Sequence, residues 1–224
     1  MTSYSILIVE DDPAVAQSLR DGLAREGFAV TWKSTGADGN EFAQKSLPHL
    51  ALLDVRLPDG SGFDFCRTMR RKGLRLPIIM LTVQQDTVDK VLGLESGADD
   101  FITKPFNLRE LVLRMRAVLR RTEERAASRA VEVLAADDFL RVDIPRREVL
   151  VDGERADLTV IEFDLLVHLL RERGRVQTRE RLLREVWGYD YAGYDRTIDT
   201  HIARLRKKLR ARGDWIETAW GVGY

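Results

Sequence analysis

The sequence is poor in cysteine and histidine: its 224 residues include one cysteine, Cys66, and three histidines. A single cysteine excludes an intramolecular disulfide and fits a reducing cytoplasm, where Cys66 is expected to be a small apolar residue of a helix. His49, His168 and His201 do not cluster with cysteines or carboxylates at metal-ligand spacing. A histidine metal site is therefore not expected.

Long apolar runs are also missing. The sequence has no run of about 18 apolar residues, so neither a transmembrane helix nor a membrane partner is expected. The segment Met1–Val9 lacks the basic flank and long apolar core of a signal peptide, so the expected location is cytoplasmic. A chain of 224 residues is long for one domain and comfortable for two.

A net excess of either charge is absent, since 36 basic residues balance 36 acidic ones. The charges are nevertheless segregated along the chain. Glu10, Asp11 and Asp12 stand in a row, whereas residues 196–212 contain one acidic residue, Asp199, among seven basic ones: Arg196, Arg204, Arg206, Lys207, Lys208, Arg210 and Arg212. The zero net charge therefore conceals an acidic segment near the N-terminus and a basic segment near the C-terminus.

The first half of the chain alternates short apolar stretches with helical patterns. Strands are expected at 4–9, 28–32, 50–53, 78–81 and 100–103, and helices after Pro13 and at 37–45, 62–71, 87–94 and 108–121. This alternation predicts an α/β fold, a doubly wound parallel sheet of strand order 2-1-3-4-5 with helices on both faces. Ligands bind such sheets outside the carboxyl ends of the strands.

The second half has a different pattern. Residues 122–132 begin with a polar stretch that lacks an apolar stripe, so we expect a linker there, able to continue the preceding helix, between domains at 1–121 and 133–224. Asp152-Gly153 predicts a hairpin turn, and Thr159 with Glu162 predicts a capping box. Further helices are expected from Thr178 and at 196–210, and a strand at 215–220 that turns at glycines into a hairpin.

Charged and polar residues follow the expected strands of the first domain: Glu10 and Asp11 the first, Asp54 the third, Thr82 the fourth and Lys104 the fifth. In the predicted sheet these ends share one edge, where three converging carboxylates favour a hard divalent cation such as Mg²⁺. The carboxylate of Asp54 can attack a phosphoryl group and form an acyl phosphate. Mg²⁺ and Lys104 would offset the phosphoryl charge, and the Thr82 hydroxyl would donate to it.

Four stretches of the first half together resemble the OmpR/PhoB family of response regulators: ILIVEDDP (6–13), LLDVRLPDGSG (52–62), LT (81–82) and GADDFITKPF (97–106). The likeness covers nearly the whole chain. It implies a (βα)5 flavodoxin-like receiver followed by an α+β winged helix-turn-helix domain. It further implies phosphorylation of Asp54 by a sensor histidine kinase and a Mg²⁺ site at Glu10, Asp11, Asp54 and the backbone carbonyl of Arg56. The Lys104–Pro105 bond is expected to be cis.

Two residues depart from the family pattern beside this site. Phe101 stands where the family usually has Tyr, the aromatic residue that swings inward as Thr82 moves, so the ring is kept and the hydroxyl is lost. Val83 stands where Ala or Gly is usual, and a β-branched side chain there is expected to narrow access to Asp54.

The resemblance also implies a homodimer that forms on phosphorylation through charged pairs of the receiver. The matching pairs here are Lys90 with Glu110, Asp100 with Arg114, and Asp99 with Arg121. Taken singly, such residues are equally typical of a solvated surface.

The helix expected at 196–210 has an apolar stripe of Ile198, Ile202, Leu205 and Leu209 and a basic opposite face that suits a DNA major groove, with Lys207 expected at a phosphate. The alternative is a solvated charged helix. Three stretches again resemble the family: 158–166, 186–188 and 196–206. By that resemblance Thr197, Thr200, Arg204 and Arg206 contact the groove, and Trp187, Arg196 and His201 lie near phosphates. The target is expected to be duplex DNA with direct-repeat half-sites, and RNA polymerase is a further expected partner.

The end of the chain, Gly221-Val-Gly-Tyr224, also resembles the family, but Trp220 stands where an Arg commonly enters the minor groove. We therefore expect weaker minor-groove readout. The chain stops before the residues that usually finish the hairpin, which suggests a trimmed end.

Two other functions compete with a phosphorylation-gated transcription factor. A Mg²⁺-dependent phosphatase would use Asp54 as its nucleophile, but it needs a second acid and leaves the second half unexplained, so we do not expect an enzyme. An atypical regulator that binds DNA without phosphorylation is kept open by Phe101 and Val83, although such proteins usually lose an acidic pocket residue and this one has not.

Overall fold

The computed structural model describes residues 4–83, 96–127, 133–137, 139–188 and 195–224. The chain divides into two compact units, Met1–Arg116 and Ala117–Tyr224. A buried apolar cluster fills each unit, built around Leu53, Met80 and Phe101 in the first and around Phe163, Trp187 and Ile202 in the second.

The first unit is built on a five-stranded parallel sheet of order β2-β1-β3-β6-β7. The strands are β1 (Ser5–Val9), β2 (Ala29–Lys33), β3 (Leu50–Asp54), β6 (Ile78–Val83) and β7 (Asp100–Lys104). Every residue of β3 is buried, as expected of a central strand covered on both faces. The predicted strand order is confirmed.

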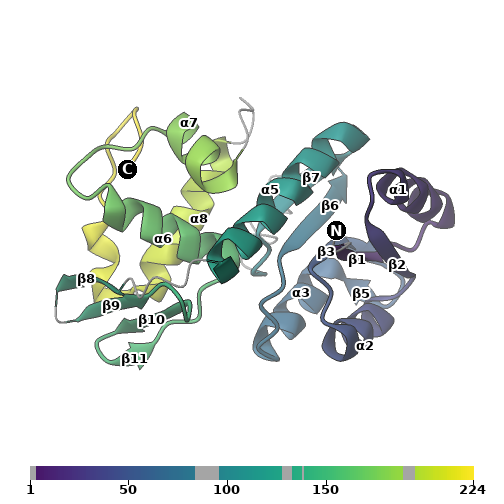
Figure 1. Ribbon diagram of the computed structural model, residues 1–224, viewed down its shortest axis with the longest axis horizontal. Helices are drawn as coiled ribbons and strands as arrows, with labels where there is room; N and C mark the ends of the chain where they lie inside the picture. The colour runs from purple at the N-terminus through teal and green to yellow at the C-terminus, as the bar shows by residue number, and fades with distance from the viewer. Residues whose placement is uncertain (1–3, 84–95, 128–132, 138, 189–194) are drawn as a thin grey trace. The chain divides into compact units, whose positions relative to one another are not determined.

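Helices cover both faces of this sheet. They are α1 (Pro13–Arg25), α2 (Gly36–Ser46), α3 (Gly62–Arg71) and α5 (Leu108–Ala127). Figure 1 shows α2 and α3 on one face and α1 on the other. The side chain of Asp12 caps α1 by accepting from the N–H groups of Ala14 and Val15. Cys66 is buried in α3, as expected.

The helix α5 runs on to Ala127, so the first part of the expected linker at 122–132 is helical. The helix expected at 87–94 lies outside the described residues. Within the described segments, no helix is long and apolar enough to cross a membrane.

The second unit begins with an antiparallel sheet of order β11-β10-β9-β8. Its strands are β8 (Val133–Asp137), β9 (Leu140–Asp143), β10 (Glu148–Val151) and β11 (Glu154–Arg155). Asp152 and Gly153 connect β10 to β11 with φ of 52° and 78°. Two successive positive φ angles are those of the tight hairpin turn that this dipeptide predicts.

The helices of the second unit are α6 (Val160–Arg171), α7 (Arg179–Leu182), the π-helical turn η1 (Leu183–Trp187), α8 (Asp195–Lys208) and the 3₁₀ helix η2 (Arg210–Trp215). Thr159 and Glu162 form the predicted capping box at the start of α6. All four residues of the predicted apolar stripe are buried, three of them in α8 and the fourth, Leu209, directly after it.

The strand expected at 215–220 is not present. Arg210–Trp215 forms η2 instead, because Arg212 N–H donates to the Leu209 carbonyl and Ile216 N–H to the Gly213 carbonyl. Gly213 packs so tightly on the end of α8 that a Cβ there would lie 2.4 Å from the Arg206 carbonyl oxygen. After η2 the chain makes a short turn with an isolated bridge between Ala219 and Gly223, which retains the hairpin without the long strand.

Candidate functional site

Four side chains meet at the carboxyl edge of the parallel sheet: Glu10, Asp11, Asp54 and Lys104, called the acidic pocket below. Glu10 and Asp11 follow β1, Asp54 ends β3 and Lys104 ends β7. The pairing register places Asp54 beside Leu81, and Val83 beside Lys104. The parallel pairing therefore brings together residues that lie up to 94 positions apart.

Lys104 joins the two buried carboxylates of the pocket. Its Nζ lies 2.6 Å from Glu10 Oε2 and 2.8 Å from Asp54 Oδ2. Glu10 and Asp54 are both buried, whereas Asp11 is exposed. The Lys104 ammonium thus lies between two buried carboxylates, and the third carboxylate, that of Asp11, is exposed to solvent.

The electrostatics of the pocket are dominated by burial, which disfavours the charged form of Glu10. Burial raises the pKa of Glu10 to about 7, and the charge of Asp54 adds to this while Lys104 opposes it. Burial would lower the pKa of Lys104, but its hydrogen bonds to Asp54 and Glu10 raise it overall. Lys104 is therefore an ammonium at neutral pH, and a further positive charge would stabilise the pocket.

The donor set fits a hard divalent cation. A carboxylate oxygen from each of Glu10, Asp11 and Asp54 lies within 4.8 Å of the other two, and Mg²⁺ prefers oxygen ligands of this kind. The backbone N–H of Arg56 lies 3.3 Å from Asp54 Oδ1, so this peptide flanks the carboxylate.

The segment after Asp54 folds closely around it. Arg56–Leu57 (β4) and Gly60–Ser61 (β5) form a small antiparallel hairpin. A Cβ on Gly62 would lie 2.0 Å from the Asp54 carbonyl oxygen, so only glycine fits there. Trp32 adds a contact that the sequence did not predict, donating from Nε1 to the Glu10 carbonyl (2.8 Å). No local pattern connects residues 22 positions apart.

The predicted switch residues lie beside the pocket. Thr82 is buried on β6 next to Thr103 of β7, and its hydroxyl lies 3.4 Å from the Val83 carbonyl. Phe101 is buried in the core beneath the sheet edge. Val83 is exposed, so its side chain lies at the surface beside this edge.

The described residues of the predicted dimer pairs make contacts within their own chain. Arg114 is buried and pairs with Asp100 (3.0 Å) and Glu110 (2.7 Å). Asp99 pairs with Arg70 (2.8 Å) and accepts from the Ile78 N–H. Lys90 lies outside the described residues, as does the side chain of Arg121.

The predicted DNA contacts on α8 are exposed or half-buried where their side chains are described, and two of them have partners within the chain. Lys207 is exposed and Thr200 is half-buried. Arg204 lies 3.3 Å from the buried Glu162, and Arg206 donates to the Ile216 carbonyl and to Thr218 Oγ1. The side chains of Arg196 and Thr197 lie outside the described residues.

Trp187 and His201 lie inside the second unit, against the expectation that they contact phosphates. Their side chains are 1% and 0% exposed, and their rings pack 5.3 Å apart. His201 follows Thr200 toward the buried stripe of α8, next to Ile202. Both side chains are therefore out of reach of a phosphate.

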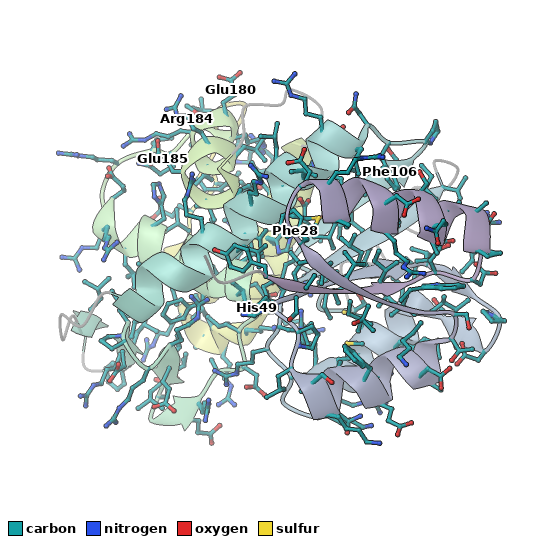
Figure 2. The ribbon with its side chains drawn as sticks, turned by 45° about the vertical axis from the view of Figure 1, so that its right-hand side comes forward. Phe28, His49, Phe106, Glu180, Arg184 and Glu185 are labelled. Atoms are coloured by element: carbon teal, nitrogen blue, oxygen red, sulfur yellow. The ribbon has the colours of Figure 1, made fainter. Side chains whose placement is uncertain are left out.

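The outer surface of α7 and η1 carries charges of both signs. Figure 2 shows Glu180, Arg184 and Glu185 pointing outward there, and Arg184 pairs with Glu185 at 3.2 Å. This surface lacks the single sign of charge that a phosphate-binding surface needs.

Comparisons with known proteins agree with this arrangement. Residues 6–116 match the response regulator receiver domain, and residues 153–224 match the C-terminal domain of transcriptional regulatory proteins. The sensory transduction protein RegX3 of Mycolicibacterium smegmatis is 41% identical over 223 residues, covering 98% of this chain and 97% of that protein. The DNA-binding response regulator MtrA of the same organism is 43% identical over 222 residues, covering 98% and 95%.

Solved structures show the same likeness. A RitR mutant, C128S, has a TM-score of 0.81 at 29% identity, covering 99% of this chain and 98% of its own. DrrB of Thermotoga maritima, an OmpR/PhoB homologue, has a TM-score of 0.52 at 32% identity, covering 100% and 98%. The fold and the two matched domains define a transcriptional response regulator, with a receiver followed by a DNA-binding domain. Within that class, the chain belongs to the OmpR/PhoB family.

Proposed function

We propose that Asp54 is the phosphoacceptor through which a sensor histidine kinase controls DNA binding. A carboxylate oxygen of Asp54 attacks the phosphorus of the kinase phosphohistidine. A P–O bond forms as the P–N bond breaks, and the imidazole leaves. The product is an acyl phosphate at the carboxyl edge of the sheet.

The pocket residues have separate parts in this step. Lys104, already 2.8 Å from Asp54 Oδ2, transfers its hydrogen bond to a phosphoryl oxygen. Thr82, next along β6 after the residue paired with Asp54, donates its hydroxyl to another. Glu10, Asp11, Asp54 and the Arg56 carbonyl would hold Mg²⁺, which when bound neutralises charge on the phosphoryl group.

The observation that carries this proposal is the Lys104 ammonium between Glu10 and Asp54. It is tested by intact mass after incubation with acetyl phosphate and Mg²⁺, comparing the wild type with Asp54→Ala. We expect one phosphoryl group on the wild type, none on the variant, and none on the wild type in EDTA. Release of free phosphate on every turnover would indicate a phosphatase instead, and no gain would indicate a regulator gated without phosphorylation.

Phosphorylation adds about −1.5 to −2 charge units at one end of the sheet. We propose that Thr82 and Phe101 respond and that the receiver then dimerises through Lys90, Asp99, Asp100, Glu110, Arg114 and Arg121. Because Arg114 and Asp99 are paired within their own chain, the dimer would have to share or exchange those pairs.

The output proposed for the second domain is binding to promoter DNA in the cytoplasm. Thr197, Thr200, Arg204 and Arg206 would face the major groove of a direct-repeat site, while Arg196 and Lys207 would meet phosphates. Arg204 and Arg206 would first have to leave their partners within the chain, Glu162 for Arg204 and the Ile216 carbonyl and Thr218 for Arg206. RNA polymerase is a proposed further partner. The proposed domain boundaries are 1–121 for the receiver, 122–132 for the linker and 133–224 for the DNA-binding domain.

A further inference from the structure

The segment that joins β2 to α2 lies at the same sheet edge as the acidic pocket. Trp32 and Lys33 end β2, and Gly36 and Ala37 begin α2. Because β2 runs parallel to β1 and pairs with it, the two strands reach this edge side by side. Residues 32–37 are called the brace below, because they contact both loops that carry the proposed metal ligands.

The brace holds the backbone of Glu10 on both sides. The Trp32 indole donates from Nε1 to the Glu10 carbonyl (2.8 Å), and the Glu10 N–H donates to the Lys33 carbonyl (3.1 Å). In the strand register Trp32 stands beside Ile8, so its indole extends past the end of β1 to the peptide that joins Glu10 to Asp11. The indole therefore fixes backbone that lies beyond the strand pairing.

This hydrogen bond bears on Asp11, the exposed carboxylate of the pocket. One oxygen of Asp11 lies within 4.8 Å of a carboxylate oxygen of Glu10 and of Asp54. Asp12, the next residue, is fixed as the cap of α1, because its side chain accepts from two backbone N–H groups (2.8 and 3.2 Å). The backbone around Asp11 is thus fixed by Trp32 before it and by the cap after it.

The brace also holds the loop that follows Asp54. The carboxylate of Asp59 accepts from the N–H of Gly36 (2.9 Å) and from the N–H of Ala37 (2.9 Å). Both donors belong to the N-terminus of α2, where negative charge is favoured. The loop that contains Arg56, whose carbonyl is a proposed Mg²⁺ ligand, is therefore tied to the same segment as the Glu10 backbone.

We propose that Trp32 and Asp59 are positioning residues of the metal site, which hold the two ligand-bearing loops at the separation that a divalent cation requires. This inference rests on the proposed function of the receiver. Neither side chain is placed as a ligand, and each acts through the backbone that it holds. Outer-shell partners of metal ligands are typically worth about 10–100-fold in metal affinity.

The physical reason is repulsion within the donor set. Three carboxylates at one sheet edge repel each other until a cation binds, and the Lys104 ammonium contacts two of them, Glu10 and Asp54. The exposed Asp11 can move toward solvent unless its backbone is fixed. A fixed backbone leaves less ordering to be done when the cation binds, so the affinity rises.

The alternative is that Trp32 is an aromatic residue that only fills space at the end of the edge strand. Trp32 is half-buried, which fits both roles. Trp32→Phe separates them, because it keeps an aromatic ring and removes the N–H that holds the Glu10 carbonyl. Asp59→Ala removes the second anchor in the same way.

The test uses the full chain with Mn²⁺ alone as the probe, since Mn²⁺ takes the same oxygen ligands as Mg²⁺ and its free form is measured by electron paramagnetic resonance. The part of the binding that Asp54→Ala loses is assigned to the pocket. Phe28→Leu is the control for Trp32→Phe, because Phe28 is a buried aromatic residue at the opposite end of β2. Asp38→Ala is the control for Asp59→Ala, because Asp38 is an exposed acid in the first turn of α2.

We expect Trp32→Phe and Asp59→Ala each to weaken Mn²⁺ binding at the pocket about 10-fold, and both controls to bind like the wild type. In phosphorylation by acetyl phosphate, followed by intact mass, the half-saturating Mg²⁺ concentration should rise by the same factor. The rate at saturating Mg²⁺ should stay near that of the wild type. A general loss of structure would lower that rate as well.

Trp32 also supplies a signal of its own, because the other three tryptophans, Trp187, Trp215 and Trp220, belong to the second unit. Its emission, taken as wild type minus Trp32→Phe, should change when Mg²⁺ is added and should not change in Asp54→Ala. An unchanged emission in the wild type would contradict a contact between the indole and the metal site.

Wild-type Mn²⁺ affinity in both Trp32→Phe and Asp59→Ala would overturn the positioning role while leaving the metal site intact. An equal loss in Phe28→Leu or in Asp38→Ala would also overturn it, since the effect would then come from stability or from net charge. Failure of the wild type to bind Mn²⁺ at the pocket would instead overturn the metal site of the proposed function.

Discussion

At the scale of single residues, Lys104 lies between two buried carboxylates of the receiver. Its ammonium replaces water for two buried carboxylates that would otherwise repel each other. The same position allows it to meet a phosphoryl oxygen when Asp54 is modified. In the proposed function, one side chain would therefore stabilise the unmodified pocket and also assist the reaction.

Replacing Lys104 by Met is expected to slow phosphorylation of Asp54 on the order of 10²-fold, because one charged donor to the developing phosphoryl charge is lost. The measurement is a time course of intact mass with acetyl phosphate and Mg²⁺. Lys45→Met is the matched control, since Lys45 is an exposed residue of α2 that pairs with Glu41. Equal rates for the two variants would rule out a role for the Lys104 ammonium in the reaction.

His201 gives the second unit a dependence on pH. Burial lowers its pKa to about 3, helped by the charges of Arg204 and Lys208, whereas Glu162 opposes the shift. Among the residues that the structure describes, neither ring nitrogen has a hydrogen-bond partner, and neither does Nε1 of the adjacent Trp187. The unfolded chain therefore binds a proton below about pH 6.5 that the folded chain does not.

Stability of the second unit should consequently fall as the pH falls through 6.5. The free energy of unfolding should drop by about 2 kcal/mol between pH 7.5 and 5 from this residue alone. This pH dependence is measured by hydrogen exchange of α8 amides in the full chain, with β1 amides as the internal reference. His201→Leu should remove most of the α8 dependence, and an unchanged dependence in that variant would assign it to other groups.

The acidic pocket was predictable and the His201 environment was not, for a physical reason. Glu10, Asp54 and Lys104 each end an apolar strand, and parallel strands bring their carboxyl ends together whatever their separation in sequence. The predicted face of α8 put His201 at its margin, where a small rotation of the helix decides between solvent and core. Trp187 likewise ends the π-helical turn η1, whose register an α-helical pattern does not give.

At the scale of elements, Glu162 joins α6 to α8. Its carboxylate accepts from the Thr159 N–H (2.8 Å) and pairs with Lys208 (2.6 Å) and Arg204 (3.3 Å). Burial alone would raise its pKa, but the two cations lower it overall. The sequence predicted the capping box but not this ion pairing across 46 positions.

Glu162→Gln keeps an acceptor for the cap and removes the charge that pairs with Arg204 and Lys208. We expect a loss of about 2 kcal/mol in the free energy of unfolding, since two partly buried cations, Arg204 and Lys208, lose their counter-charge. Chemical denaturation followed by tryptophan fluorescence measures this. Glu172→Gln, on a less buried carboxylate that pairs with Arg175 and Arg181, should cost much less. A similar loss in both variants would contradict a special role for Glu162.

The elements themselves differed in how well sequence predicted them. The hairpin at Asp152-Gly153 followed from two positions that take positive φ. The β8 strand and the η2 helix did not follow from the sequence. Residues 133–137 have little strand-forming alternation, and the conformation of residues 210–215 is determined by packing of Gly213 on α8. A local sequence pattern predicts a helix or strand when hydrogen bonds or a turn within that segment determine its conformation. It fails to predict the element when packing against a part of the chain distant in sequence determines the conformation.

At the scale of the whole molecule, the zero net charge arises from two domains with separate charge requirements. The receiver gathers carboxylates at one sheet edge, where they bind Mg²⁺ in the proposed function. The DNA-binding domain concentrates basic residues on α8 and just after it. Phosphorylation adds charge to the first domain, so its effect on DNA binding requires a change in how chains associate or in how the two domains interact.

Dimerisation of the receiver would supply that change, because two linked DNA-binding domains bind a direct repeat more tightly than one. Reversal of charge by Arg114→Glu should abolish the dimer, since it places a carboxylate beside Asp100 and Glu110. Sedimentation velocity with and without acetyl phosphate and Mg²⁺ measures the mass. Arg116→Glu is the control, because Arg116 lies on the same helix and pairs with Glu26 instead.

The wild type and Arg116→Glu should approach twice the monomer mass when phosphorylated, and Arg114→Glu should remain monomeric. Since Arg114 is also paired within its own chain, intact mass must show that Arg114→Glu is still phosphorylated on Asp54. A phosphorylated wild type that stays monomeric would exclude dimerisation as the link between the two domains. Control of DNA binding would then have to come from release of the DNA-binding domain within a single chain.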